Sequence, residues 1–199
     1  GGGRGALCID LCQRRPHEWS DLELGLMLAS IMHSSRVSSL TLRGFRFCGG
    51  HGRGRDPAAA SLATRALAAV LGRSASLERL ELRACSLDEA ALDLFSRAIR
   101  ANRCLPLRSL GLAGCDGLPR ASDAAGGALS DVVRHLAAPL LELELDGCGV
   151  GGRALCGVLD ALHRHEHRFR APALLRRLTL PSEAIEAAPA RAALASLRI

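Results

Sequence analysis

Three histidines and a glutamate stand close together in the segment 163–167, His-Arg-His-Glu-His. On a helix, His163 and His167 are one turn apart, and imidazole nitrogens are common ligands of zinc. A third fixed ligand beside them is not evident from the sequence, and the neighbouring residues include arginines. Histidine also suits the negative end of a helix dipole. We therefore interpret His163, His165 and His167 as a polar helix end and assign no metal ligand, and metal binding by the cluster stays open as the alternative.

A second segment whose residues could bind a ligand is the glycine- and arginine-rich stretch at 43–56, RGFRFCGGHGRGRD. Arginines in such a loop can contact phosphate or an acidic groove on a protein. The stretch lacks the Gly-Lys-Ser/Thr ending of a Walker loop. It also lacks repeated aromatic residues that would stack on bases. A flexible insertion is the plainer interpretation, and a binding loop stays open beside it.

No arrangement typical of catalysis accompanies these two segments. The sequence shows no Ser-His-Asp set, no paired carboxylates and no Cys-x-x-Cys motif. Without a nucleophile beside a base, or a matched acid and base, no catalytic residue can be assigned. We predict that the protein is not an enzyme and that it uses no cofactor.

The sequence around these two segments consists of a leucine pattern that repeats along the chain. Residues 77–87, LERLELRACSL, follow the pattern L-x-x-L-x-L-x-x-C-x-L, which returns at 107–118 and 140–150. Looser copies stand at 37–47 and 175–180, with further partial copies near both ends of the chain. Apolar stripes with helical spacing follow the copies, for example Leu129, Val132, Val133 and Leu136. Short strands that alternate with helices at a fixed interval indicate a solenoid.

Polar residues mark where the helices of these units begin. Ser20 and Glu23 fit a capping box, which predicts a helix from there to about His33. Asp88 fits an N-cap after the 77–87 strand. Asp56, followed by Pro57, predicts the start of the helix that precedes that strand.

Together, the copies and their helices resemble the leucine-rich repeats of the ribonuclease-inhibitor type. The resemblance is most specific at 77–87, 107–118 and 140–150, and it is weaker at 37–47, where Phe45 replaces the expected Cys or Asn. It implies an α/β solenoid, or horseshoe, with a parallel sheet on the concave face and helices on the convex face. It also implies protein binding, without naming a partner.

We predict a single domain of this kind over residues 1–199, with about six or seven repeats. Terminal repeats of a solenoid normally carry caps, and none is visible here. We therefore expect the chain to be a fragment of a longer protein, or to have its ends covered by a partner.

The outward strand positions are the best candidates for binding, because leucines take the alternating inward ones. In the early repeats these positions hold mixed and basic residues, in the next repeat small residues, and after that a block of three acidic residues. Such blocks suit electrostatic selection of a partner, although a merely solvated face with cross-strand pairs is the alternative. The residues predicted to contact a partner, on the strands and in the loop, are Arg43, Arg46, Arg53, Arg55, Arg79, Glu81, Arg83, Glu142, Glu144, Asp146 and Arg177.

The predicted function is a non-catalytic scaffold or adaptor that binds a protein partner, within a larger assembly, through the concave face and the 43–56 loop. Two alternatives stay open. Some leucine-rich-repeat proteins of this helix-rich type regulate a small GTPase with a positioned arginine, but none of the 26 basic residues, all arginine, stands out here. An RNA-associated subunit would use the Arg/Gly loop and the net charge of +6.

Cysteine placement bears on the compartment. The chain has eight cysteines, and Cys85, Cys115 and Cys148 take the same position in three copies. A thiol in such a position is buried as a small hydrophobic group with a weak donor. We therefore predict reduced thiols in an intracellular compartment, cytoplasmic or nuclear, rather than a disulfide framework. No apolar run reaches about 18 residues, so no membrane-spanning segment and no membrane partner are predicted.

Overall fold

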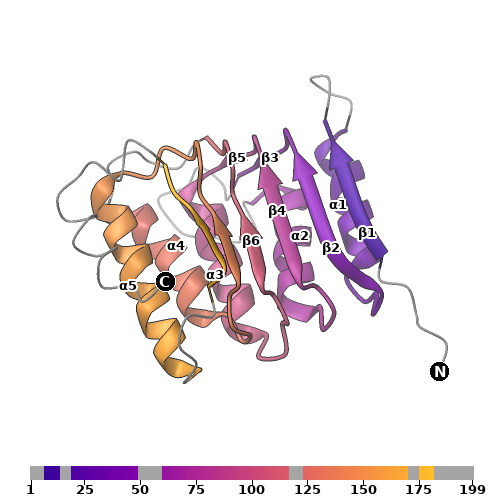
Figure 1. Cartoon of the computed structure of the whole chain (residues 1–199). Helices are drawn as coiled ribbons and strands as arrows, with labels where there is room; N and C mark the ends of the chain where they lie inside the picture. Colours follow the sequence, from indigo (N-terminus) through magenta and orange to yellow (C-terminus); the bar gives the residue numbers. More distant parts are fainter. Residues whose placement is uncertain (1–6, 14–18, 49–59, 117–122, 170–174, 182–199) are drawn as a thin grey trace.

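A computed structural model describes residues 7–13, 19–48, 60–116, 123–169 and 175–181. Strands and helices alternate in an α/β fold (Figure 1). A six-stranded sheet takes the following strands in chain order, each parallel to its neighbours: β1 (Leu7–Cys12), β2 (Val37–Arg43), β4 (Arg79–Arg83), β6 (Ser109–Gly111), β7 (Glu142–Glu144) and β8 (Arg177–Thr179). A small second sheet pairs β3 (Arg46–Phe47) with β5 (Ser86–Leu87).

The helices lie together on one face of the six-stranded sheet (Figure 1). They are α1 (Asp21–Ile31), α2 (Leu62–Arg73), α3 (Glu89–Ala101), α4 (Asp123–His135) and α5 (Gly152–Arg168). Each helix packs against the next one along the chain. None of the helices in the described ranges is long and apolar enough to cross a membrane. The opposite face of the sheet, hereafter the open face, carries none of the helices in the described ranges.

Leucines form the inner layer between sheet and helices. The register places Leu40, Leu80, Leu110, Leu143 and Leu178 beside one another across β2, β4, β6, β7 and β8. The first four are at most 3% exposed, and the apolar stripe predicted at 129–136 is buried against them in one continuous core. The prediction of an α/β unit that repeats with a parallel sheet is therefore confirmed.

Two of the three predicted helix starts are confirmed. The Ser20 hydroxyl accepts a hydrogen bond from the Glu23 amide at 3.1 Å, and the Glu23 carboxylate accepts one from the Ser20 amide at 2.8 Å. The Asp88 carboxylate accepts one from the Ala91 amide at 2.7 Å.

The prediction that Asp56 and Pro57 begin the next helix is wrong, because α2 begins at Leu62 after the N-cap Ser61. The Ser61 hydroxyl accepts a hydrogen bond from the Thr64 amide at 3.2 Å. In addition, the Asp21 carboxylate of α1 accepts from the amides of Leu62 and Ala63 at 2.7 and 3.0 Å. A cap supplied by the preceding helix thus helps to fix where α2 starts.

Each thiol at the repeated cysteine position bonds to the preceding unit. The Cys85, Cys115 and Cys148 thiols donate to the carbonyl oxygens of Leu42, Leu82 and Leu112 at 3.3, 3.1 and 2.9 Å. All three side chains are buried, and burial raises the pKa of the Cys148 thiol to about 12. The eight cysteines are free thiols in the structure. The repeated cysteine is therefore a structural donor that links neighbouring units.

A turn with left-handed backbone follows four successive strands of the large sheet. It stands two residues after the last leucine of each L-x-x-L-x-L segment, at Gly44, Ala84, Gly114 and Gly147, with φ values of 76°, 49°, 65° and 66°. Glycine adopts this conformation without steric cost, whereas a side chain raises its energy. At Gly44 a Cβ atom would also lie 2.9 Å from the carbonyl oxygen of Gln13.

The substitution Gly44→Ala is therefore expected to lower the free energy of unfolding by about 1–2 kcal/mol, because it adds left-handed strain and a backbone clash. Urea denaturation monitored by circular dichroism measures the change. Ala84→Gly is the matched control at the same position of the next unit, and it is expected not to destabilise. Wild-type stability in the Gly44→Ala protein would show that this turn tolerates a side chain.

Candidate protein-binding face

The open face carries two rows of side chains that the parallel register aligns. The first row contains Ser39, Arg79, Ser109, Glu142 and Arg177, and the second contains Thr41, Glu81, Gly111, Glu144 and Thr179. These are the outward positions predicted from the leucine pattern. The rows bring together residues that lie up to about 140 positions apart in the sequence.

A network of ion pairs occupies the middle of this face. The Arg79 guanidinium lies 3.3 Å from the Glu81 carboxylate and 3.2 Å from that of Glu142. The Arg83 guanidinium lies 2.9 Å from Glu81 and 3.5 Å from Glu144. Each arginine on β4 thus pairs with a glutamate of its own strand and reaches across β6 to a glutamate on β7.

Small side chains on β6 make this reach possible. The Ser109 hydroxyl donates to the Glu142 carboxylate at 2.8 Å and so adds to the network. A Cβ atom on Gly111 would lie 3.4 Å from Glu81 Cγ and 3.5 Å from Glu144 Oε2, in van der Waals contact, so the two glutamates already lie close to this glycine. The patch of small residues seen in the sequence therefore has a structural role between two charged strands.

The network neutralises most of its own charge. It combines two arginines with three glutamates, which leaves one net negative charge. The side chains are 15–45% exposed, and an ion pair of this kind contributes about 0–1 kcal/mol. Two of the three residues that read as an acidic block in the sequence are therefore engaged within the sheet itself.

The other predicted contact residues lie around this network. Arg43 pairs with Asp10 at 3.5 Å near the β1 edge, and Arg46 is exposed on the small second sheet. Asp146 and Arg177 are exposed and form no ion pair with another described residue. Arg53 and Arg55 lie outside the described residues, so the role of the 43–56 loop stays a prediction.

At the N-terminal ends of the strands the open face is hollowed. The hollow has a volume of about 450 Å³. The residues that line it come from every strand of the large sheet or from the position just before it: Cys8, Ser38, Ser39, Glu78, Arg79, Arg108, Ser109, Leu141, Glu142 and Arg176. Two of them, Arg108 and Arg176, were not among the predicted contact residues.

The backbone amides of Arg108 and Arg176 are hydrogen-bonded, whereas their guanidinium groups form no ion pair among the described residues. Their amides donate to the carbonyl oxygens of Glu78 and Leu141 at 2.8 and 2.7 Å, which extends the ladder of the sheet by one residue. Both are exposed, and neither guanidinium pairs with an acid within the described part of the chain. In the sequence each follows the first leucine of its copy, Leu107 or Leu175, and this position is the signal that would have found them.

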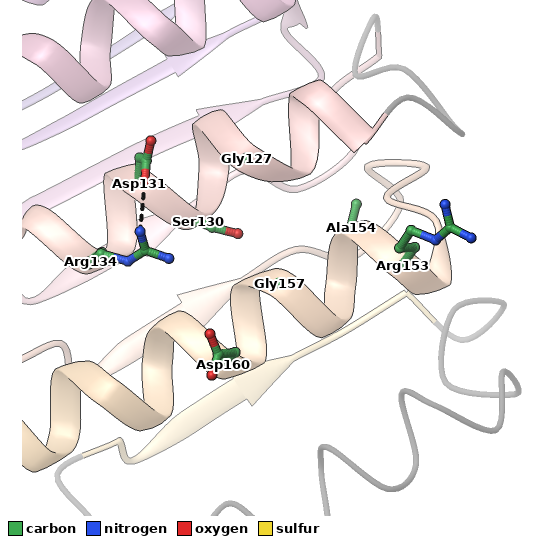
Figure 2. Close-up of a pocket in the computed structure, with 8 residues that line it drawn as sticks. All are labelled: Gly127, Ser130, Asp131, Arg134, Arg153, Ala154, Gly157 and Asp160. Carbon is green, nitrogen blue, oxygen red and sulfur yellow. Dashed lines mark hydrogen bonds and ion pairs between the residues drawn. The ribbon is translucent and has the colours of Figure 1, made fainter.

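A second hollow, of about 380 Å³, lies on the helical side between α4 and α5 (Figure 2). Small residues let the helices approach here: a Cβ atom on Gly157 would lie 3.0 Å from the Ser130 hydroxyl. Asp131 pairs with Arg134 at 3.2 Å, and Arg153 and Asp160 complete the charged lining. With two acids and two arginines, this hollow does not favour a ligand of either charge.

The histidine cluster divides between the two sides of α5. His165 is 3% exposed, and its Nε2 lies 3.3 Å from the Leu140 amide and 3.2 Å from the Ala138 carbonyl. Burial lowers the pKa of His165 to about 4. His163 and His167 face outward and lie close to each other. Among the described residues no group of three or more potential ligands comes together to hold a metal ion.

Comparison with known proteins bears on the fold. No protein-family model matches the chain, and no curated protein matches it significantly in sequence. Among solved structures, the tropomodulin C-terminal domain from Caenorhabditis elegans matches with a TM-score of 0.58 and 13% sequence identity, over 84% of this chain and 89% of that chain. The likeness is to the fold alone. It supports an α/β, leucine-rich-repeat-like fold for the chain.

Proposed function

We propose that the chain is a non-catalytic protein-interaction module that binds an acidic segment of a partner protein on the open face of its sheet. The leucine-rich-repeat-like fold supports this proposal, since such sheets present a broad, pre-organised surface. We further propose that the units form a curved solenoid of the ribonuclease-inhibitor type, with the open face concave, as a scaffold within a larger intracellular assembly.

The observation that carries the proposal is a pair of arginines at the hollow that form no ion pair with an acid among the described residues. Arg108 and Arg176 stand just before β6 and β8, which flank β7. Two strand spacings separate them by roughly 9–10 Å. Guanidinium groups bind carboxylates through two parallel hydrogen bonds. Two such groups on a rigid sheet therefore suit a segment with two suitably spaced Asp or Glu side chains.

The same hollow fits a protein better than a nucleic acid. Glu78 and Glu142 line it beside the arginines, so sites that favour an anion are separated from one another and do not match the continuous line of charge on a phosphate backbone. The phenylalanines Phe45, Phe47 and Phe95 are buried, so none of these rings is available to stack on a base. A peptide places its carboxylates at separate points, and serine and backbone groups of the hollow can bond to the segment between them.

The proposal predicts that partner capture depends on Arg108 and Arg176. The double variant Arg108→Glu/Arg176→Glu is expected to lose at least roughly tenfold in affinity, because two charge-assisted contacts become repulsive. The control Arg65→Glu/Arg100→Glu makes the same change in net charge at exposed positions of the helices. Tagged proteins are compared by affinity capture from cell extract, and the captured proteins are then titrated as purified components.

Competition by a soluble poly-glutamate peptide, and weakening at high salt, are expected for the wild type and the control. If both double variants capture the same proteins equally well, the hollow is not the interface. If the captured material is nucleic acid that poly-glutamate does not displace, the partner class is wrong. Circular dichroism of each variant checks that the fold is kept.

A further inference from the structure

His163 and His167 lie on the solvent side of α5, four residues apart. Their Nε2 atoms are 3.2 Å from each other, and their rings are nearly perpendicular, with centroids 4.4 Å apart and an interplanar angle of 84°. In helices of zinc enzymes, two histidines with this spacing hold one ion. The third histidine of the cluster, His165, points the other way into the core.

From this geometry we infer that His163 and His167 form a chelating site for a divalent transition-metal ion. Zinc binds imidazole nitrogen at about 2.0–2.1 Å. An ion at that distance from two nitrogens 3.2 Å apart subtends an angle of roughly 100°, near the tetrahedral value. Rotation of the rings would then direct both lone pairs to the ion.

Packing of α5 sets this geometry in advance. Leu155, Leu162 and His165 are buried against the rest of the fold, which fixes the rotation of the helix and turns His163 and His167 outward. A pre-organised pair loses less entropy on binding than two free side chains would. Metal binding at this pair is therefore expected to require the folded helix, and not only the presence of histidines in the segment.

The guanidinium groups of the two neighbouring arginines contact other groups. The Arg164 guanidinium lies 3.1 Å from the Asp160 carboxylate, and the Arg168 guanidinium donates to the Leu136 carbonyl at 3.4 Å. Both arginines are thus engaged with groups other than the histidine pair. The pair also stands in the last turns of the helix, where the helix dipole favours positive charge.

The class of ion follows from the ligands. Imidazole suits Zn²⁺, Ni²⁺ and Cu²⁺, with Cu²⁺ bound most tightly in the general order for divalent ions. Two protein ligands leave the remaining positions to water, or to a carboxylate of another molecule. The site lies on the helical side of the fold and does not depend on the binding proposed for the open face.

Titration of the tag-free protein with Zn²⁺ alone tests the inference. Exposed thiols such as Cys8, Cys12 and Cys104 are first alkylated, because thiolates would also bind zinc. Calorimetry is expected to show one saturable site. His163→Ala and His167→Ala are each expected to weaken it by roughly tenfold or more, because the second nitrogen of a chelate binds at high effective concentration. His33→Ala, at an exposed position elsewhere, is expected to leave it unchanged.

The NMR signals of the two imidazole rings provide a second measurement, and both are expected to shift together on addition of one equivalent of Zn²⁺. Absence of a saturable site would overturn the inference and leave the two rings as a hydrogen-bonded neutral pair. Binding that survives His167→Ala would overturn it as well. Circular dichroism of each variant confirms that α5 is intact before the titration.

Discussion

Replacing Phe47 by alanine is expected to lower the free energy of unfolding by about 3–5 kcal/mol. Phe47 is fully buried, and it sits on β3, where the chain turns from the large sheet toward the helices. Its ring meets the edge of the Phe95 ring of α3, with centroids 6.1 Å apart. Truncation removes this aromatic contact and leaves a cavity that the leucines and thiols around it cannot fill without distorting the sheet.

Leu22→Ala provides the matched control, because it also removes a large apolar side chain. Leu22 is 58% exposed on α1, so its loss is expected to change stability by no more than about 0.5 kcal/mol. Phe47→Leu is expected to fall between the two. Guanidinium denaturation of the three variants measures the order, and equal stability of Phe47→Ala and Leu22→Ala would contradict the assigned core.

The leucine layer was predictable from the sequence because it depends on a local rule. Side chains alternate across a strand and recur on one face of a helix, so the spacing of Leu77, Leu80 and Leu82 already determines which residues face the core. The same spacing in later copies then determines the register between strands. Cys85, Cys115 and Cys148 follow from the same rule, and the structure adds the carbonyl oxygens to which their thiols donate.

The state of the charges on the open face was not predictable in this way. Arg83 and Glu144 are 61 positions apart, and their pairing depends on the side-chain conformations and on the small residues of the strand between them. Sequence reasoning placed these residues on one face correctly, but it could not tell a paired charge from a free one. It therefore selected Arg79 and Arg83, which are engaged in ion pairs, and passed over Arg108 and Arg176, which precede their strands.

The start of α2 likewise could not be predicted from the residues next to it. Asp56 and Pro57 form a plausible helix start by composition, but the observed start at Leu62 is supported by the Asp21 carboxylate, 41 residues earlier in the chain. When the capping residue belongs to a neighbouring element, the sequence next to the capped helix contains no signal of it. Such contacts are where tertiary structure overrides the local preference of the sequence.

Lowering the pH from 6.5 to about 4 is expected to destabilise the protein through His165, by as much as about 3 kcal/mol. Burial holds the pKa of His165 at about 4 in the folded state, against 6.5 for an ordinary histidine. Between these values the unfolded chain takes up a proton that the folded chain does not, so unfolding is favoured as pH falls. Well above pH 6.5 the residue is neutral in both states and contributes no pH dependence.

The free nitrogen of His165 explains why protonation is costly. Its Nδ1 atom is buried and has no hydrogen-bond partner among the described residues, so in the tautomer whose Nε2–H donates to the Ala138 carbonyl a second ring proton, on Nδ1, would have no acceptor. His165→Leu is therefore expected to flatten the fall in stability between pH 6.5 and 4, even if its absolute stability differs. Urea denaturation at several pH values measures this slope, with His33→Leu as the exposed control. An unchanged slope in His165→Leu would mean that other groups, such as carboxylates, cause the loss.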